Sequence, residues 1–127
     1  MGCQACHGPA SAHLAWAKGD RTSSGAASRK GFAVDARAGR AQVDACGYCH
    51  ALRATLTAEY PPGAPLLDHA LPTSLDGTSY FADGQQREEG FILGSWLQSR
   101  MHQKGLVCSD CHDPHSGKLR AAGDALC

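Results

Sequence analysis

Three Cys-x-x-Cys-His motifs constrain the fold of this chain more than any other feature of its sequence. They occupy positions 3–7, 46–50 and 108–112 of 127 residues. Two thiols about one helical turn apart can add to the two vinyl groups on one porphyrin edge, and the adjacent imidazole then lies under the iron as its proximal ligand. The spacing therefore predicts three covalent c-type haems, attached through Cys3, Cys6, Cys46, Cys49, Cys108 and Cys111 and bound at the iron by His7, His50 and His112.

Zinc ribbons and disulfide frameworks are the alternative uses of paired cysteines. Four thiolates would bind zinc without the histidines, and the 39 residues between Cys6 and Cys46 and the 58 between Cys49 and Cys108 exceed the usual ribbon spacing. A disulfide framework would leave an odd thiol among seven cysteines. A thioredoxin-type site lies next to a βαβ pattern, and no such pattern surrounds any of the three cysteine pairs. Haem attachment is favoured because it also accounts for the three histidines.

The chain has few large aliphatic side chains with which to fill a core. Leu, Ile, Val and Phe make up about 15% of the residues, below the roughly 20% at which composition begins to indicate disorder. The net charge of zero argues against disorder. Ordering such a chain costs more free energy than its own apolar burial can offset. We therefore expect a haem-cored fold, mainly α-helical with extensive irregular loops and few or no strands.

Local signals predict helices close to the motifs. Pro9 can open a short helix over residues 10–17. Ala, Leu and Gln favour a second helix over 41–60, before two consecutive prolines. Residues 86–104 carry an apolar stripe at helical spacing and precede a glycine that can end a helix. The intervening segments 19–31 and 61–84 are predicted loops, the first a flexible surface segment and the second pinned by His69.

Four histidines outside the motifs are candidates for the sixth coordination position of the haems: His13, His69, His102 and His115. His115 lies three residues after His112, on the same side of a turn, whereas a sixth ligand must approach the opposite porphyrin face. Pro114 also disfavours helix at the residue before it. We therefore expect His115 to serve a different haem from His112, and such an exchange of ligands would hold the haems close enough for electron hopping.

Each of these four histidines has a plain surface or loop histidine as its alternative interpretation. Met101 competes with His102 on the last predicted helix, because a thioether ligand would raise the potential of its haem above those of bis-histidine neighbours.

The last motif and its surroundings resemble multihaem c-type cytochromes. The segments 99–102, 105–107 and 108–116 are similar to a recurring block of periplasmic multihaem cytochromes, some of which belong to larger proteins with tetratricopeptide repeats. The resemblance also takes in residues 6–9 with His13, and residues 80, 83–85 and 94–95. It implies electron transfer in the periplasm or another extracytoplasmic compartment, with redox proteins as partners. The resemblance also implies relatives among the nitrite and hydroxylamine haem enzymes. In the nitrite-reductase type a lysine replaces the motif histidine at the active haem, whereas all three motifs here keep histidine.

Both ends of the sequence resemble cut points in a longer chain. Residues 125–127 are similar to the opening of a fourth motif, so Cys127 is a candidate attachment site for a fourth haem. No signal peptide precedes Cys3 and no run approaches 18 apolar residues, so we expect an upstream export signal and no membrane span in this segment. The balanced charge and pI near 7.0 exclude a strong case for nucleic-acid binding. We expect residues 1–127 to form one multihaem module.

The sequence is consistent with two functional classes. The favoured class is an electron carrier whose haems are mostly bis-histidine and six-coordinate, with no catalytic residues. The alternative is a multihaem oxidoreductase or gas-binding protein with one five-coordinate haem and chemistry of the nitrogen-oxide type. The two classes differ in whether any haem has an open coordination position.

Overall fold

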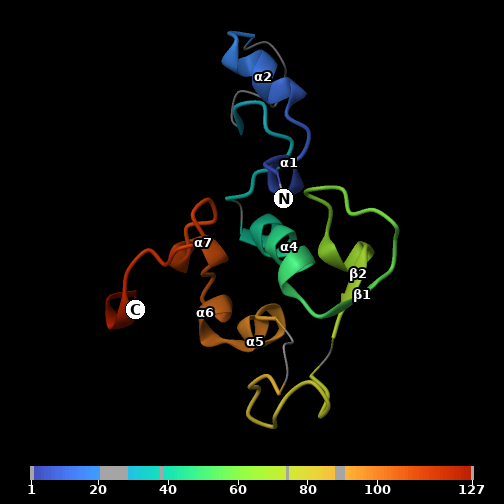
Figure 1. Ribbon diagram of the computed structural model, residues 1–127, viewed down its shortest axis with the longest axis vertical. Coiled ribbons are helices and arrows are strands. Elements are labelled where there is room, and N and C mark those ends of the chain that lie inside the picture. The colour runs from blue at the N-terminus through green and yellow to red at the C-terminus, as the bar shows by residue number, and fades with distance from the viewer. Residues whose placement is uncertain (1, 21–28, 38, 74, 88–90, 127) are drawn as a thin grey trace.

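The protein is mostly helical with many loops, and its one sheet within the described residues has two short strands. The computed structural model describes residues 2–20, 29–37, 39–73, 75–87 and 91–126. Figure 1 shows a helix near the middle of the molecule, α4, with α7 on one side and the sheet on the other. The predicted helical, loop-rich fold class is confirmed. The helices are α1 (Gln4–His7), α2 (Ser11–Ala17), α4 (Gly39–His50), α5 (Leu93–Gln98), α6 (Arg100–Gln103) and α7 (Cys108–Cys111).

The helix expected after Pro9 is present as α2, one residue shorter at its start than predicted. The composition of residues 19–31 predicts a flexible surface loop after α2, but the end of this segment is packed against the helix. Residues 21–28 lie outside the described part of the chain, but Gly31 is buried with a φ of 78°. A Cβ at Gly31 would lie 2.5 Å from the carbonyl oxygen of Ala12. The loop therefore returns to pack its backbone directly on α2, which only glycine allows.

The helix predicted over 41–60 is wrong beyond His50. The chain instead forms strand β1 (Arg53–Thr55), which pairs antiparallel with β2 (Ala70–Pro72). The amide of Leu56 also donates to the carbonyl of His69 at 2.9 Å, which extends the ladder. Helix propensity is a weak preference that long-range pairing can override. The loop predicted over 61–84 consequently contains β2 and a short 3₁₀ helix, η1 (Leu66–Asp68). A second 3₁₀ helix, η2, spans Gly123–Leu126.

The helix predicted over 86–104 is divided into two short ones. Residues 88–90 lie outside the described residues, and Gln86 forms an isolated bridge with Tyr80 instead of a helical turn. Ser99 separates α5 from α6 in an extended conformation, and its hydroxyl accepts a hydrogen bond from the amide of His102 at 3.2 Å. Serine competes with helix continuation by capping the next helix in this way.

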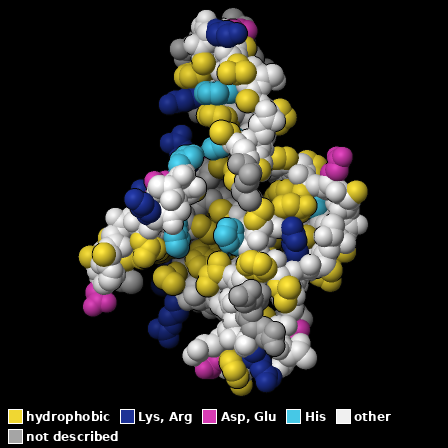
Figure 2. Space-filling view, viewed as in Figure 1, with side chains coloured by type: hydrophobic (Ala, Val, Ile, Leu, Met, Phe, Trp, Pro, Cys, Tyr) yellow, Lys and Arg dark blue, Asp and Glu magenta, His cyan; other side chains and the backbone are white. Residues whose placement is uncertain are grey.

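The hydrophobic core of the described residues is small. Leu66, Ala70 and Leu93 are buried with Val43 and Ala51, and Tyr48 and Trp96 pack against them. No large described side chain is fully buried, and many apolar ones are exposed, Ile92 by 59% and Leu71 by 60% among them. The accessible surface is 8763 Å², whereas a compact monomer of this mass exposes about 6,500 Å². On the face seen in Figure 2, hydrophobic side chains lie openly near the middle of the molecule, with histidines around them.

No helix in the described ranges is both long enough and apolar enough to cross a membrane. This agrees with the expected lack of a membrane span in this segment.

Candidate functional site

Each Cys-x-x-Cys-His motif of the described chain coincides with a turn of helix. The first motif forms α1, the second forms the last turn of α4, and the third forms α7. Residues three apart in a helical turn lie on the same side, so each motif presents its two thiols together. The six motif cysteines described by the structure are all free, three of them exposed and three half-buried. Cys127 lies outside the described residues. The structure records no disulfide among these six cysteines.

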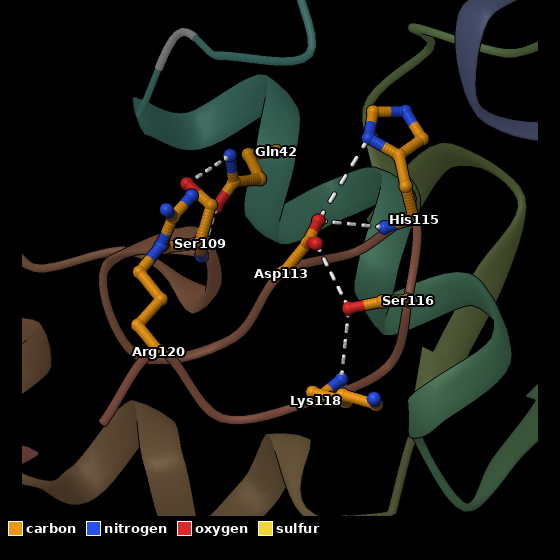
Figure 3. Close-up of polar contacts among 7 residues, drawn as sticks. All are labelled: Gln42, Ser109, Asp113, His115, Ser116, Lys118 and Arg120. Carbon is orange, nitrogen blue, oxygen red and sulfur yellow. Dashed lines mark hydrogen bonds and ion pairs between the residues drawn. The ribbon is translucent and has the colours of Figure 1, made fainter.

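The three motifs converge around α4. The buried side chain of Gln42 accepts a hydrogen bond from the Ser109 amide at 2.8 Å and donates to the Ser109 hydroxyl at 3.0 Å, so it fixes α7 against α4 (Figure 3). The thiols of Cys46 and Cys108 are hydrogen-bonded, which lowers the pKa of Cys108 to about 7 and raises that of Cys46, whose burial acts in the same direction. Cys6 is also close enough to raise the pKa of Cys46.

In two of the four candidate histidines outside the motifs, a hydrogen bond to a backbone carbonyl fixes the imidazole ring. His13 Nδ1 lies 2.7 Å from the carbonyl oxygen of Lys30, and His102 Nδ1 lies 3.0 Å from that of Leu97. A carbonyl oxygen can only accept, so the hydrogen of each ring is on Nδ1. In the neutral imidazole, Nε2 then carries a free lone pair, which is the state of a metal-binding histidine whose other nitrogen is held by the protein.

His69 also carries its ring hydrogen on Nδ1, and here the acceptor is the side chain of Thr57. Its Nδ1 lies 2.7 Å from the hydroxyl oxygen of Thr57, and that hydroxyl donates its one hydrogen to the carbonyl of Glu59 at 2.7 Å. Thr57 must therefore accept from His69, which again leaves Nε2 with a free lone pair. The ring of His69 meets the edge of Tyr60 at 5.6 Å, and Tyr60 stacks on Tyr48 of the second motif at 4.2 Å. This stacking brings the loop that carries His69 to α4.

His115 is held by the turn that follows the third motif (Figure 3). Asp113 Oδ1 accepts a hydrogen bond from the His115 amide at 3.1 Å and lies 3.9 Å from its Nδ1. Asp113 Oδ2 accepts from the hydroxyl of Ser116 at 2.8 Å. These bonds and the nearby His115 ring lower the pKa of Asp113, so its carboxylate is ionised at neutral pH. As Pro114 predicted, helix α7 ends before Asp113.

Aromatic rings flank three of the histidines, His7, His13 and His102. Phe32 stacks on His13 with ring centroids 4.0 Å apart and also contacts the motif histidine His7 at 4.9 Å. Trp96 contacts His102 at 4.6 Å. Phe32 and the acceptors for the three Nδ1 atoms are site residues that the sequence analysis missed. Carbonyl acceptors leave no signal in a sequence, and Phe32 lies just beyond a segment with a loop composition.

His102 also lines a groove beside α4 with a volume of about 260 Å³. The groove is mostly apolar, and α4, η1 and α5 supply most of its lining. Its walls include Arg40, Val43, Asp44, Leu66, Leu67, Pro72, Leu93, Leu97 and His102.

The donor set does not match a structural zinc site. Within the residues that the structure places, no three His, Cys, Asp or Glu side chains are grouped to hold one metal ion. A structural zinc ion needs four such ligands around a single point. A haem needs two from the protein at its iron, because the porphyrin supplies the other four. Comparisons with protein-family models, with curated proteins and with solved structures find no match to this chain.

Proposed function

We propose that this protein transfers electrons through three covalently bound c-type haems, most of them bound by two histidines. The observation that carries the proposal is the state of the histidines outside the motifs. His13, His69 and His102 each donate Nδ1–H to a fixed acceptor and keep Nε2 free, as metal-binding histidines do. The chain has three attachment motifs, so three such rings equal the number of sixth coordination positions to be filled.

The attachment motifs fit the same group. Free thiols three residues apart on a helical turn suit addition to two vinyl groups, and the histidine that follows lies next to the second thiol. Bound haem iron supplies one-electron chemistry by alternating between its ferric and ferrous states. The motif histidines and the histidines outside the motifs would hold the iron and exclude water from it, and the Nδ1 acceptors of His13, His69 and His102 would tune its potential.

The exposed apolar surface is a second support. The protein leaves about a third more surface accessible than a compact monomer of its mass does, and leucine and phenylalanine side chains and Ile92 are among the exposed groups. Three porphyrins would cover this surface in the way that a protein core normally does. The contacts between the motifs would place the haems side by side, so that electrons pass between them and on to redox partner proteins in an extracytoplasmic compartment.

Mass spectrometry and ligand titration test the proposal. Protein matured in the periplasm of a host with haem-attachment machinery should gain the mass of three haems. The reduced form should bind little carbon monoxide, since six-coordinate iron has no open position. Matured protein that carries zinc and no haem would overturn the proposal. Stoichiometric carbon monoxide binding at one haem would favour the oxidoreductase or gas-binding alternative over the electron carrier.

A further inference from the structure

We propose that Arg53 binds a propionate carboxylate of a haem held beside the second motif, through the pair of N–H groups on one side of its guanidinium. This inference rests on the proposed function and adds a contact at the edge of the porphyrin, away from the iron. Arg53 follows the motif histidine His50 by three residues and begins strand β1.

The hydrogen bonding of the Arg53 side chain carries the inference. Its Nε is buried and makes no hydrogen bond to any residue that the structure describes. The described carboxylates form no ion pair with it either. A buried N–H without an acceptor is destabilising, and more so when the group is charged. Arg53 therefore offers a donor for which the described polypeptide supplies no anion.

The ring of Tyr48 holds the guanidinium in place without accepting this hydrogen bond. Arg53 Cζ lies 4.3 Å from the centroid of the Tyr48 ring. A cation over an aromatic face is attracted by the π electrons, while the N–H groups point outward in the plane of the guanidinium and stay able to donate. Because Tyr48 belongs to the second motif, the stacking fixes the cation next to a haem attachment site.

Two other arginines show the bonding that Arg53 lacks. Arg40 Nε donates to the Asp44 carboxylate at 3.3 Å, and Arg120 Nε donates to a backbone carbonyl. The Arg40 side chain is 71% exposed and still has a protein acceptor, whereas the half-buried Arg53 has none for its Nε among the described residues. A propionate would give Arg53 the interaction that Asp44 gives Arg40.

The position of β1 also suits an anionic, largely apolar group. Arg53 pairs with Pro72 in the strand ladder, and Pro72 is one wall of the groove beside α4. The charges of Arg40 and Asp44 in that groove balance each other, so Arg53 adds a positive charge beside it that no described carboxylate neutralises. Each haem carries a pair of propionates on the porphyrin edge opposite its vinyl groups. A positive charge near the porphyrin favours ferrous over ferric iron, so Arg53 would raise the potential of that haem.

The test compares Arg53→Gln with Arg53→Lys in the matured three-haem protein. Arg53→Gln removes the charge, so one haem should show a lower midpoint potential, by up to a tenfold change in its ferrous-to-ferric ratio, or about 59 mV. Arg53→Lys keeps the charge and should retain most of the potential. The propionate bending band in the resonance Raman spectrum should shift in both variants, because lysine lacks the paired N–H groups. Unchanged potentials and bands would overturn the inference, and equal losses of potential would assign the effect to the stacking on Tyr48.

Arg87→Gln is the matched control. Arg87 also lies over an aromatic ring, with its Cζ 5.2 Å from the Phe81 centroid, but its Nη1 donates to the Gly77 carbonyl. The substitution should change neither the potentials nor the propionate bands. If Arg53→Gln does not mature, the Raman spectrum of Arg53→Lys decides, and an unchanged band there would overturn the inference.

A soluble anion is the other source of a carboxylate for Arg53. The potentials of the wild-type protein should not change when acetate is added at constant ionic strength. An acetate-dependent potential that Arg53→Gln abolishes would assign Arg53 to a soluble anion and overturn the propionate contact. Wild-type protein that carries no haem after maturation would instead contradict the proposed function itself.

Discussion

At the scale of single residues, the site depends on which ring nitrogen of each histidine carries the hydrogen. The carbonyls of Lys30 and Leu97 and the hydroxyl of Thr57 determine this without any change in the histidines themselves. The acceptor keeps Nε2 unprotonated and also makes the imidazole a stronger donor to a metal. The sequence shows the histidines, and the fold selects their tautomers.

Replacing His102 by Ala should convert one haem to the high-spin state and open a carbon monoxide site. Met101, the competing ligand, is 46% exposed, whereas His102 is held by Leu97 and Trp96. Met101→Ala should therefore leave the spectrum low-spin. Optical spectra of the ferric and the carbon monoxide forms measure both variants. The reverse result would assign the ligand to Met101, and no change in either would return His102 to an ordinary surface role.

Replacing Thr57 by Val should raise the midpoint potential of one haem. Valine keeps the shape of threonine but cannot accept from His69 Nδ1–H, so the imidazole becomes a weaker donor and stabilises ferric iron less. A tenfold change in relative affinity corresponds to about 59 mV for one electron, so we expect a rise of that order or smaller. Potentiometric titration measures it. Thr55→Val in the neighbouring exposed strand is the control and should leave all potentials unchanged.

At the scale of elements, short helices are held by specific side-chain bonds and not by their own length. Helix α7 has four residues, far fewer than the number at which an isolated helix is stable in water. Gln42 of α4 supplies the bonds that α7 lacks, and it also donates to the carbonyl of Ala36 at 2.8 Å. The buried amide of Gln42 is thus one of the groups that hold the third motif, together with the thiol of Cys46 and with Arg120, whose side chain donates to the Ser109 carbonyl.

Gln42→Ala should destabilise the holo protein by about 1–3 kcal/mol, because it leaves the half-buried Ser109 amide and Ala36 carbonyl without their partner. Urea unfolding followed by the haem absorbance measures the change. Gln103→Ala on the exposed side of α6 is the control, and we expect a change within about 0.5 kcal/mol there. Equal effects of the two substitutions would mean that Gln42 does not hold α7.

Gly94→Ala should also destabilise the protein, even though alanine favours helix over glycine by about 1 kcal/mol. A Cβ at position 94 would overlap the hydroxyl of Tyr80 and lie 2.9 Å from its ring carbon Cζ. Tyr80 is buried and its ring is rigid, so overpacking of this kind costs about 1–3 kcal/mol. Gly39→Ala, at the start of α4 with open space around it, should be neutral or stabilising in the same urea unfolding experiment. A gain in stability at both positions would contradict the packing of α5 on Tyr80.

At the scale of the whole molecule, the protein's own side chains do not close a core. Few apolar residues of the described chain are buried, and the accessible surface exceeds that of a compact monomer by about a third. The arrangement of the helices around exposed leucines is understandable if prosthetic groups complete the interior. Cofactor binding and folding should then be coupled, as in small metal-dependent domains.

The haem-free chain should therefore be largely unfolded. We expect circular dichroism of cytoplasmically expressed apo protein to show little helix and no cooperative thermal transition, while the holo form shows both. Holo protein that carries the Cys3→Ala and Cys6→Ala substitutions and two haems should fall between them. A cooperative transition in the apo protein with the helix content of the holo form would show that the polypeptide folds without a cofactor.

The sequence by itself determined the general class of fold, and it predicts the chemistry that we propose for the three motifs. The composition and the helix and turn signals are local features, and they predict a mainly helical fold with many loops, which the structure has. The helices at the first and third motifs, α1 and α7, were not among those predicted. Three decisions were left to the tertiary structure: the strand pairing that ends the second helix at His50, the break at Ser99, and the approach of His115 to His7. Each depends on long-range contacts or caps that compete with local propensity. Intrinsic propensities differ by only a few tenths of a kcal/mol per residue, so they do not predict which structure forms there.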